Sequence, residues 1–116
     1  CNLGFLYWGK GDTDEAIREY EYAIEYDKSY SIAYNNLGVI YLDDLGRVKE
    51  AIDMFKKAVE YNPNYALAHF NLARSIAITG EKIEAAKLYQ IAQDVNKITN
   101  EIDPQDITDK INALFD

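Results

Sequence analysis

The sequence predicts an all-α fold in which antiparallel helix pairs repeat along a single array, an α-solenoid. Three observations support this prediction. One pattern of small and large apolar residues occurs three times in the 116 residues. Its copies are spaced by 34 and 35 residues, a period typical of helical repeat arrays. Within each copy, a glycine separates two stretches whose apolar residues recur with helical spacing.

The three copies agree in six columns. In the second copy the first column is Leu37-Gly38, and the matching pairs are Leu3-Gly4 and Leu72-Ala73. Its remaining columns are an aromatic residue, a glycine and three further apolar residues: Tyr41, Gly46, Ala51, Phe55 and Ala58. The one irregularity is an extra residue between Tyr41 and Gly46.

Residue size explains these columns. Leu37, Gly38 and Tyr41 share one face of a helix, and Ala51, Phe55 and Ala58 share one face of the next. The small residues allow two helix backbones to approach closely, and the large ones fill the space beside them. We therefore expect these columns to form the core of each helix pair.

The periodicity predicts seven helices, at about 1–10, 13–27, 31–44, 47–61, 65–79, 81–98 and 104–115. Gly46 can end one helix, and Pro63 follows another where the helix cannot continue. Asp103-Pro104 is a typical N-cap and first-turn pair for the last helix. That helix carries an apolar stripe of Ile107, Ile111, Leu114 and Phe115. We assign three repeats and a capping helix of one domain to residues 1–30, 31–65, 66–99 and 100–116.

The second copy resembles the tetratricopeptide repeat signature. The matching residues are Ala33-Tyr34-Asn35-Asn36-Leu37-Gly38, Tyr41, Gly46, Glu50-Ala51-Ile52, Phe55, Ala58 and Asn62-Pro63-Asn64. Departures are Lys28 and Lys97 in place of an inter-repeat proline, and His69 in place of an aromatic residue. The resemblance implies a right-handed superhelix whose first helices line a concave groove. Members of this family bind extended peptides or partner helices in that groove.

The first copy starts in the middle of the pattern, at the residues that flank Leu3-Gly4. We therefore expect the chain to be part of a longer protein with further repeats upstream. For the same reason we do not expect Cys1 to be a lipid anchor. A single cysteine allows no intrachain disulfide and favours a reducing, cytoplasmic location.

Candidate groove residues are those on the first helices that lie off the packing stripe. They include Asn2, Phe5, Trp8, Asn35, Asn36, Val39, Leu42, Leu67, Phe70, Asn71, Arg74 and Ile78. An asparagine precedes each leucine of the first column, and one amide can bond both the C=O and the N–H of a peptide. The set Asn2, Asn36 and Asn71 resembles the asparagine ladder of O-linked N-acetylglucosamine transferases and kinesin light chains. The alternative is that these amides solvate the groove or bond a neighbouring helix.

The remaining groove candidates leave two questions open. The apolar ones form either a partner's anchor site or a surface covered by upstream repeats or the last helix. Arg74 pairs with either a ligand carboxylate or Asp43. Chaperone-binding members of the family hold a terminal carboxylate with several Lys, Arg and Asn side chains. The corresponding positions here include Cys1, Phe5 and Leu67, so we expect no binding of chaperone tails.

Composition excludes several classes of function. The net charge of −8 disfavours nucleic-acid binding, and no apolar run is long enough to span a membrane. The sole histidine, His69, occupies a packing position and lacks a nucleophile partner, so we expect neither catalysis nor a cofactor or metal site. The sequence favours an interaction scaffold for a protein or peptide. Alternatives are a self-assembly module and the substrate-recruiting arm of a larger enzyme.

Overall fold

The computed structural model describes residues 13–115, which form six α-helices and one π-helical turn. In chain order these are α2 (Thr13–Tyr26), α3 (Ser31–Val39), η1 (Ile40–Asp44), α4 (Val48–Tyr61), α5 (Ala66–Ile78), α6 (Lys82–Thr99) and α7 (Pro104–Leu114). Each predicted boundary in this range lies within one residue of the observed one, if α3 and η1 are taken together. The helix predicted at about 1–10 lies outside the described residues.

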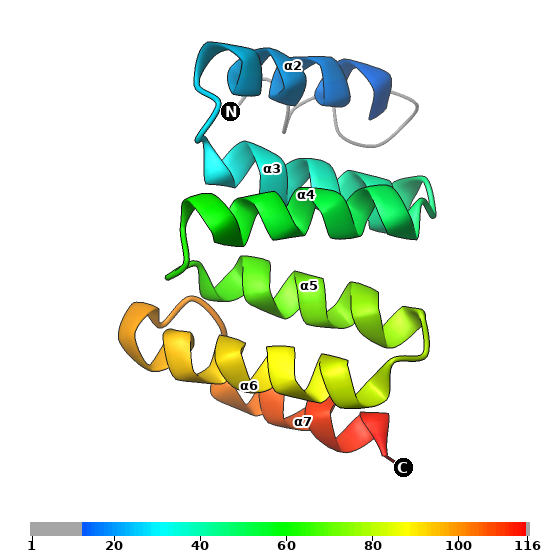
Figure 1. Ribbon diagram of the computed structural model, residues 1–116, viewed down its shortest axis with the longest axis vertical. Coiled ribbons are helices and arrows are strands. Elements are labelled where there is room, and N and C mark those ends of the chain that lie inside the picture. The colour runs from blue at the N-terminus through cyan, green and yellow to red at the C-terminus, as the bar shows by residue number, and fades with distance from the viewer. Residues whose placement is uncertain (1–12, 116) are drawn as a thin grey trace.

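The helices stack in chain order along one array (Figure 1). Each packs on the next, from α2 against α3 to α6 against α7, and α3 also contacts α5. In the view of Figure 1, α4 lies in front of α3 and α6 lies in front of α7. The contact between α3 and α5 brings the first helices of two successive repeats side by side. The predicted all-α array of packed helix pairs is confirmed.

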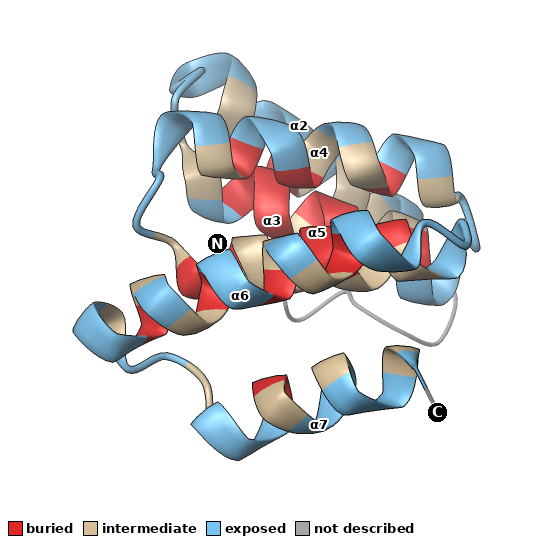
Figure 2. Cartoon of the chain, turned by 60° about the horizontal axis from the view of Figure 1, so that its bottom comes forward, coloured by how far each residue is buried: buried red, intermediate tan, exposed pale blue. Residues whose placement is uncertain are grey.

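The repeated columns form the core, as predicted. The small residues Ala16, Ala51 and Ala85 are fully buried, and so are Ala58 and Ala92. The aromatic column is buried as well, at Tyr20, Phe55 and Tyr89. Figure 2 shows buried residues along the inner faces of the helices and exposed residues along their outer faces. Residue size in each column therefore sets how closely the helices pack.

The contact between Gly38 and Phe55 is the tightest requirement in the second repeat. A Cβ atom at Gly38 would lie 2.5 Å from the ring of Phe55, closer than real Cβ contacts. The ring belongs to a fully buried side chain, so it has little room to move. Only glycine allows α3 and α4 to approach this closely.

The extra residue of the second copy is accommodated by the π-helical turn η1. The Leu45 N–H donates to the Ile40 carbonyl at 3.1 Å, a bond that spans five residues. A π turn holds one residue more than an α turn, so it absorbs the insertion without shifting the packing columns. Leu42, predicted to line the groove, does not do so. Leu42 lies in the core with 7% of its surface exposed, because the wider turn directs it inward.

The predicted helix ends are also observed. Gly46 and Gly80 have φ of +65° and +93°, a backbone region that glycine adopts at little cost. The Asp103 side chain accepts a hydrogen bond from the Gln105 N–H at 3.0 Å, with Pro104 in the first turn. The last helix docks through Ile107, which is fully buried. Phe115, predicted on the same stripe, lies beyond the helix end and is exposed, because α7 stops at Leu114.

His69 has the structural role that its position predicts. Its Nε2 atom lies 2.8 Å from the Pro63 carbonyl oxygen, and the imidazole N–H donates to that carbonyl. In the preceding repeat, the Tyr34 hydroxyl donates to the Lys28 carbonyl at 3.1 Å. Two different side chains in one column thus hold equivalent turns between helix pairs.

We predict that Gly38→Ala destabilises the fold. Alanine gains about 1 kcal/mol in helix propensity, but overpacking a core costs about 1–3 kcal/mol. Because the Phe55 ring is fully enclosed, we expect a net loss of about 1 kcal/mol or more in the free energy of unfolding. Urea denaturation measures it. Phe55→Leu should lower the free energy of unfolding less in the Gly38→Ala variant than in the parent chain. Equal stability of Gly38→Ala and the parent would contradict the proposed constraint.

Candidate functional site

A pocket of about 340 Å³ lies where α3 and α5 run side by side. Its lining residues come from four elements: Tyr20 from α2, Asn35, Asn36 and Val39 from α3, Ile40 from η1, and Leu67, Asn71 and Arg74 from α5. The pocket therefore sits on the face where the first helices of two repeats meet. The residues predicted for the groove that line this pocket include Asn35, Asn36, Val39, Asn71 and Arg74.

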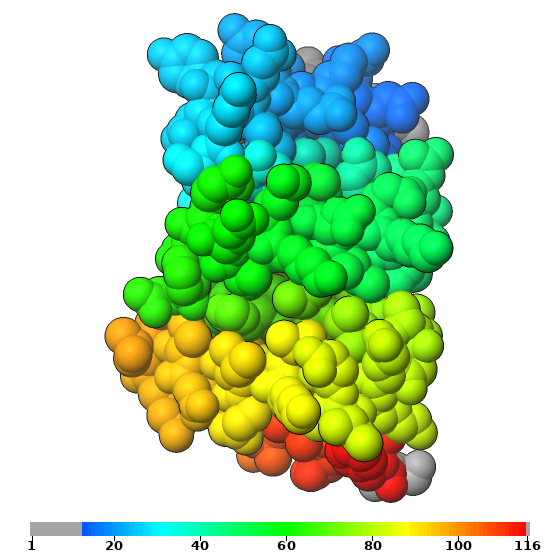
Figure 3. Space-filling view, viewed as in Figure 1, coloured from blue at the N-terminus to red at the C-terminus, as the bar shows by residue number. Residues whose placement is uncertain are grey.

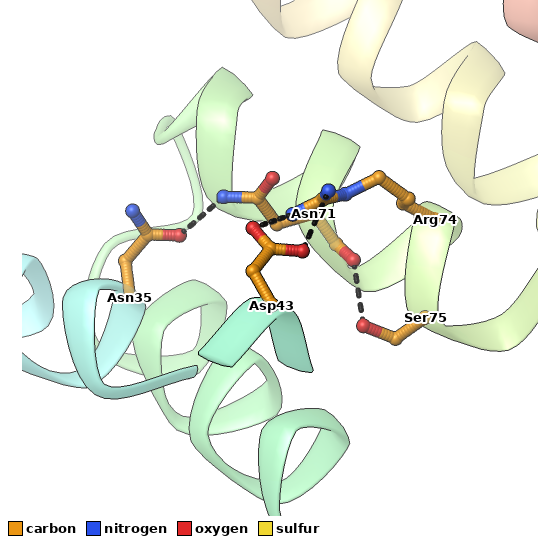
Figure 4. Close-up of polar contacts among 5 residues, drawn as sticks. All are labelled: Asn35, Asp43, Asn71, Arg74 and Ser75. Atoms are coloured by element: carbon orange, nitrogen blue, oxygen red, sulfur yellow. Dashed lines mark hydrogen bonds and ion pairs between the residues drawn. The ribbon is translucent and has the colours of Figure 1, made fainter. Parts of the chain in front are cut away.

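Two asparagines of adjacent repeats bond each other across this face. The Asn71 Nδ2 donates to the Asn35 Oδ1 at 3.0 Å (Figure 4). The Asn35 Nδ2 in turn donates to the Tyr65 hydroxyl at 3.4 Å. Only 2% of Asn35 and 5% of Asn71 is exposed. Asn71 therefore bonds a neighbouring helix, which is the alternative to gripping a peptide backbone. Its amide oxygen takes no part in this bond (Figure 4), and the side chain still lines the pocket.

Asn36 has a different environment from Asn71. It is half-buried, lines the pocket and lies beside the Tyr20 hydroxyl. Burial raises the pKa of Tyr20 above its ordinary value, and the hydrogen bond with Asn36 offsets part of this rise. An amide can make more than one hydrogen bond, so Asn36 keeps capacity for a ligand.

Arg74 is held by Asp43 in a bidentate ion pair. The Nη1–Oδ1 and Nη2–Oδ2 distances are 3.1 and 3.2 Å (Figure 4). Asp43 belongs to η1, so the inserted residue and this pair lie in the same turn. The intramolecular pairing of Arg74 is confirmed. The positive charge in this pocket is therefore neutralised by a fixed carboxylate.

The apolar candidates occupy different environments. Val39 lines the pocket and is half-buried, whereas Ile78 is exposed at the end of α5. Phe70 packs against the core, with its ring centroid 5.4 Å from that of Tyr89 in an edge-to-face contact. Phe70 is thus largely structural. The predicted groove residues Asn2, Phe5 and Trp8 lie outside the described residues.

Sequence reasoning missed two pocket residues, Tyr20 and Ile40. Tyr20 was placed in a packing column, which is where its ring lies, but its hydroxyl reaches the pocket beside Asn36. Ile40 is buried in the core and contributes one side to the pocket. A periodic pattern places a side chain on a face, but it does not show what the far end of that side chain touches.

The start of α5, where Leu67 lines the pocket, is capped from a distant segment. Glu101 accepts hydrogen bonds from the backbone N–H groups of Ala66 and Leu67, at 3.2 and 3.3 Å. This carboxylate replaces a side-chain cap at Tyr65, which makes none. Burial and then the nearby Glu101 charge raise the pKa of Tyr65. The turn before α7 therefore helps to fix this end of the pocket.

We predict that Asn71→Ala lowers stability and that Asn36→Ala changes it far less. Removing the Asn71 amide leaves the buried Asn35 oxygen without its donor, which costs about 1–3 kcal/mol. Asn36 is more exposed, so water can replace its side chain. Urea denaturation of the two variants measures the difference. Equal losses of unfolding free energy in the two variants would show that the Asn35–Asn71 hydrogen bond does not stabilise the fold.

Comparison with known proteins agrees with this geometry. A family model described as tetratricopeptide repeat matches residues 1–58. A second, described as TPR repeat, matches residues 44–75. No curated protein matches the chain.

Solved structures share the fold over nearly the whole chain. The TPR2B domain of yeast Sti1, in a complex with pHsp70, superposes with a TM-score of 0.88 and is 22% identical, covering 97% of this chain and 90% of that one. The type III secretion translocator chaperone SycD of Yersinia enterocolitica has a TM-score of 0.87 at 18% identity, covering 97% and 79%. MamA has a TM-score of 0.77 at 24% identity, covering 86% and 58%.

Two further observations bear on the class of site. None of the helices that the structure describes is both long and apolar enough to cross a membrane. Among residues 13–115, no group of three or more His, Cys, Asp and Glu side chains could hold a metal ion. The repeated columns, the packed helix pairs and the matching family models together show that this chain belongs to the tetratricopeptide repeat family.

Proposed function

We propose that the chain is a protein-interaction module that binds an extended peptide segment in the pocket between α3 and α5. The observation that carries the proposal is the lining of this pocket. Three asparagine amides lie among apolar side chains, including Val39 and Leu67. Such a surface suits a peptide, whose backbone needs hydrogen-bond partners and whose side chains need apolar contacts.

Within this proposal, Asn36 and Asn71 bond the peptide backbone. Asn36 is half-buried and borders the pocket, so a ligand can reach it without a change in the fold. Asn71 is held in one orientation by its bond to Asn35, which presents its free oxygen at a fixed place. A pre-set acceptor loses less side-chain entropy on binding than a mobile one.

The charges of the site favour an uncharged stretch of peptide. Arg74 is neutralised by Asp43, so it offers a ligand carboxylate no unpaired charge. A clamp for a terminal carboxylate needs several free donors, and among the described pocket residues Arg74 is the single cation. We therefore propose that the partner segment is internal and apolar, and not a carboxyl terminus.

The similar structures are consistent with a binding role. The structure of yeast Sti1 is that of a TPR2B domain in complex with pHsp70, so in that protein the same fold holds a partner. No residue of the pocket between α3 and α5 is given a catalytic role in this proposal. The pocket is lined by amides, apolar side chains, a phenol and a neutralised guanidinium, a set suited to holding a ligand.

Peptides selected from a random display library on the 116-residue chain provide the test. We expect Asn36→Ala to weaken the selected peptides about tenfold, the effect of losing one or two hydrogen bonds. Calorimetric titration measures the affinity. Asn112→Ala, on the exposed face of α7, is the matched control and should leave it unchanged. If Asn36→Ala binds as tightly as the parent chain, backbone capture by this amide is refuted.

A further inference from the structure

The outer face of α6 carries a stripe of exposed residues that serves no function described above. Three isoleucines on this helix are exposed, at 70% for Ile83, 42% for Ile91 and 81% for Ile98. Lys87 and Asp94, also exposed, lie between them. The five residues are spaced by four, four, three and four positions, which places them on one side of the helix. We call them the α6 seam.

The seam is separate from the peptide pocket, which has no lining residue on α6. In Figures 1 and 3, α6 lies on the outside of the array and is uncovered along its length. Phe115, which is exposed, lines a shallow hollow with Ile83 and so adds apolar surface at one end of the seam. Exposed apolar residues that recur along one helix face are typical of an interaction surface.

The order of residues in the seam shows what kind of surface would complement it. Read forward, the seam is Ile, Lys, Ile, Asp, Ile, and read backward it is Ile, Asp, Ile, Lys, Ile. A second α6 running antiparallel therefore presents isoleucine to isoleucine and an opposite charge to each charge. A parallel α6 would instead place lysine against lysine and aspartate against aspartate.

We propose that two copies of this chain associate through the α6 seam in an antiparallel, two-fold arrangement. The two-fold axis passes between Gln90 and Ile91. Ile83 then packs on the partner's Ile98, and the two Ile91 side chains meet at the centre. Lys87 pairs with the partner's Asp94, and Asp94 with the partner's Lys87. Such an interface is self-complementary, as two-fold dimer contacts must be.

Contacts within α6 leave the charges of the seam available. Asp94 accepts a hydrogen bond from Gln90 at 3.2 Å and lies 3.8 Å from Lys97 in a loose, solvent-exposed pair. Exposed pairs of this kind are worth little, so exchanging them for a pair at a dimer contact carries a small cost. Further repeats would stack on the ends of the array, whereas the seam residues are exposed along the side of α6.

Charge exchange tests the register of the dimer. Sedimentation velocity of the 116-residue chain across a concentration series should show a monomer–dimer equilibrium. Lys87→Asp alone and Asp94→Lys alone place like charges opposite each other, and each should raise the dimer dissociation constant by at least about tenfold. The double variant Lys87→Asp/Asp94→Lys restores opposite charges and should recover the dimer.

Two further variants complete the test. Ile91→Lys should abolish the dimer, and because Ile91 is an exposed residue its circular-dichroism melt should match that of the parent. Lys110→Asp makes the same charge change as Lys87→Asp on the exposed face of α7 and should leave the dimer intact. A strictly monomeric parent chain overturns the proposal. So does a dimer that survives Ile91→Lys, or a double variant that stays as weak as the single ones. Peptide binding at the pocket is unaffected by these outcomes, so the two proposals fail independently.

Discussion

The close approach of α3 and α4 at Gly38 is the constraint on which the rest of the structure depends. The Phe55 ring occupies the space that a side chain at position 38 would need. With these two helices pressed together, α5 packs against α4 and also reaches α3. That second contact creates the pocket and brings Asn71 within 3.0 Å of Asn35. A wider spacing between α3 and α4 would separate the two asparagines and open the pocket.

The π-helical turn links this packing to the chemistry of the pocket. It absorbs one inserted residue, so the columns before and after it keep their register. It also turns Leu42 into the core and leaves Asp43 on the surface, where Asp43 binds Arg74. Irregular turns of this kind frequently lie at functional sites. Because Asp43 lies in this turn, the guanidinium of Arg74 at the pocket is neutralised by an ion pair.

Much of the fold could be predicted because its determinants are local or periodic. Gly46 and Asp103-Pro104 mark helix ends by their own conformational preferences, and the alanine columns mark helix contacts by size. The pocket was less predictable because it depends on residues distant in sequence. No periodic pattern indicates that Glu101 caps α5, or that Asn71 is committed to Asn35. The inward turn of Leu42 follows from a π turn that the sequence showed only as one extra residue.

In the proposed mode of binding, the pocket amides contact the backbone of a bound peptide. Nuclear Overhauser measurements on the chain, saturated with a peptide from the display selection, test it most directly. We predict cross-peaks from the side-chain NH₂ group of Asn36 to backbone protons of the peptide, with the Asn71 NH₂ group still close to Asn35. Cross-peaks confined to residues outside the pocket, with the Asn36 resonances unchanged, would contradict it.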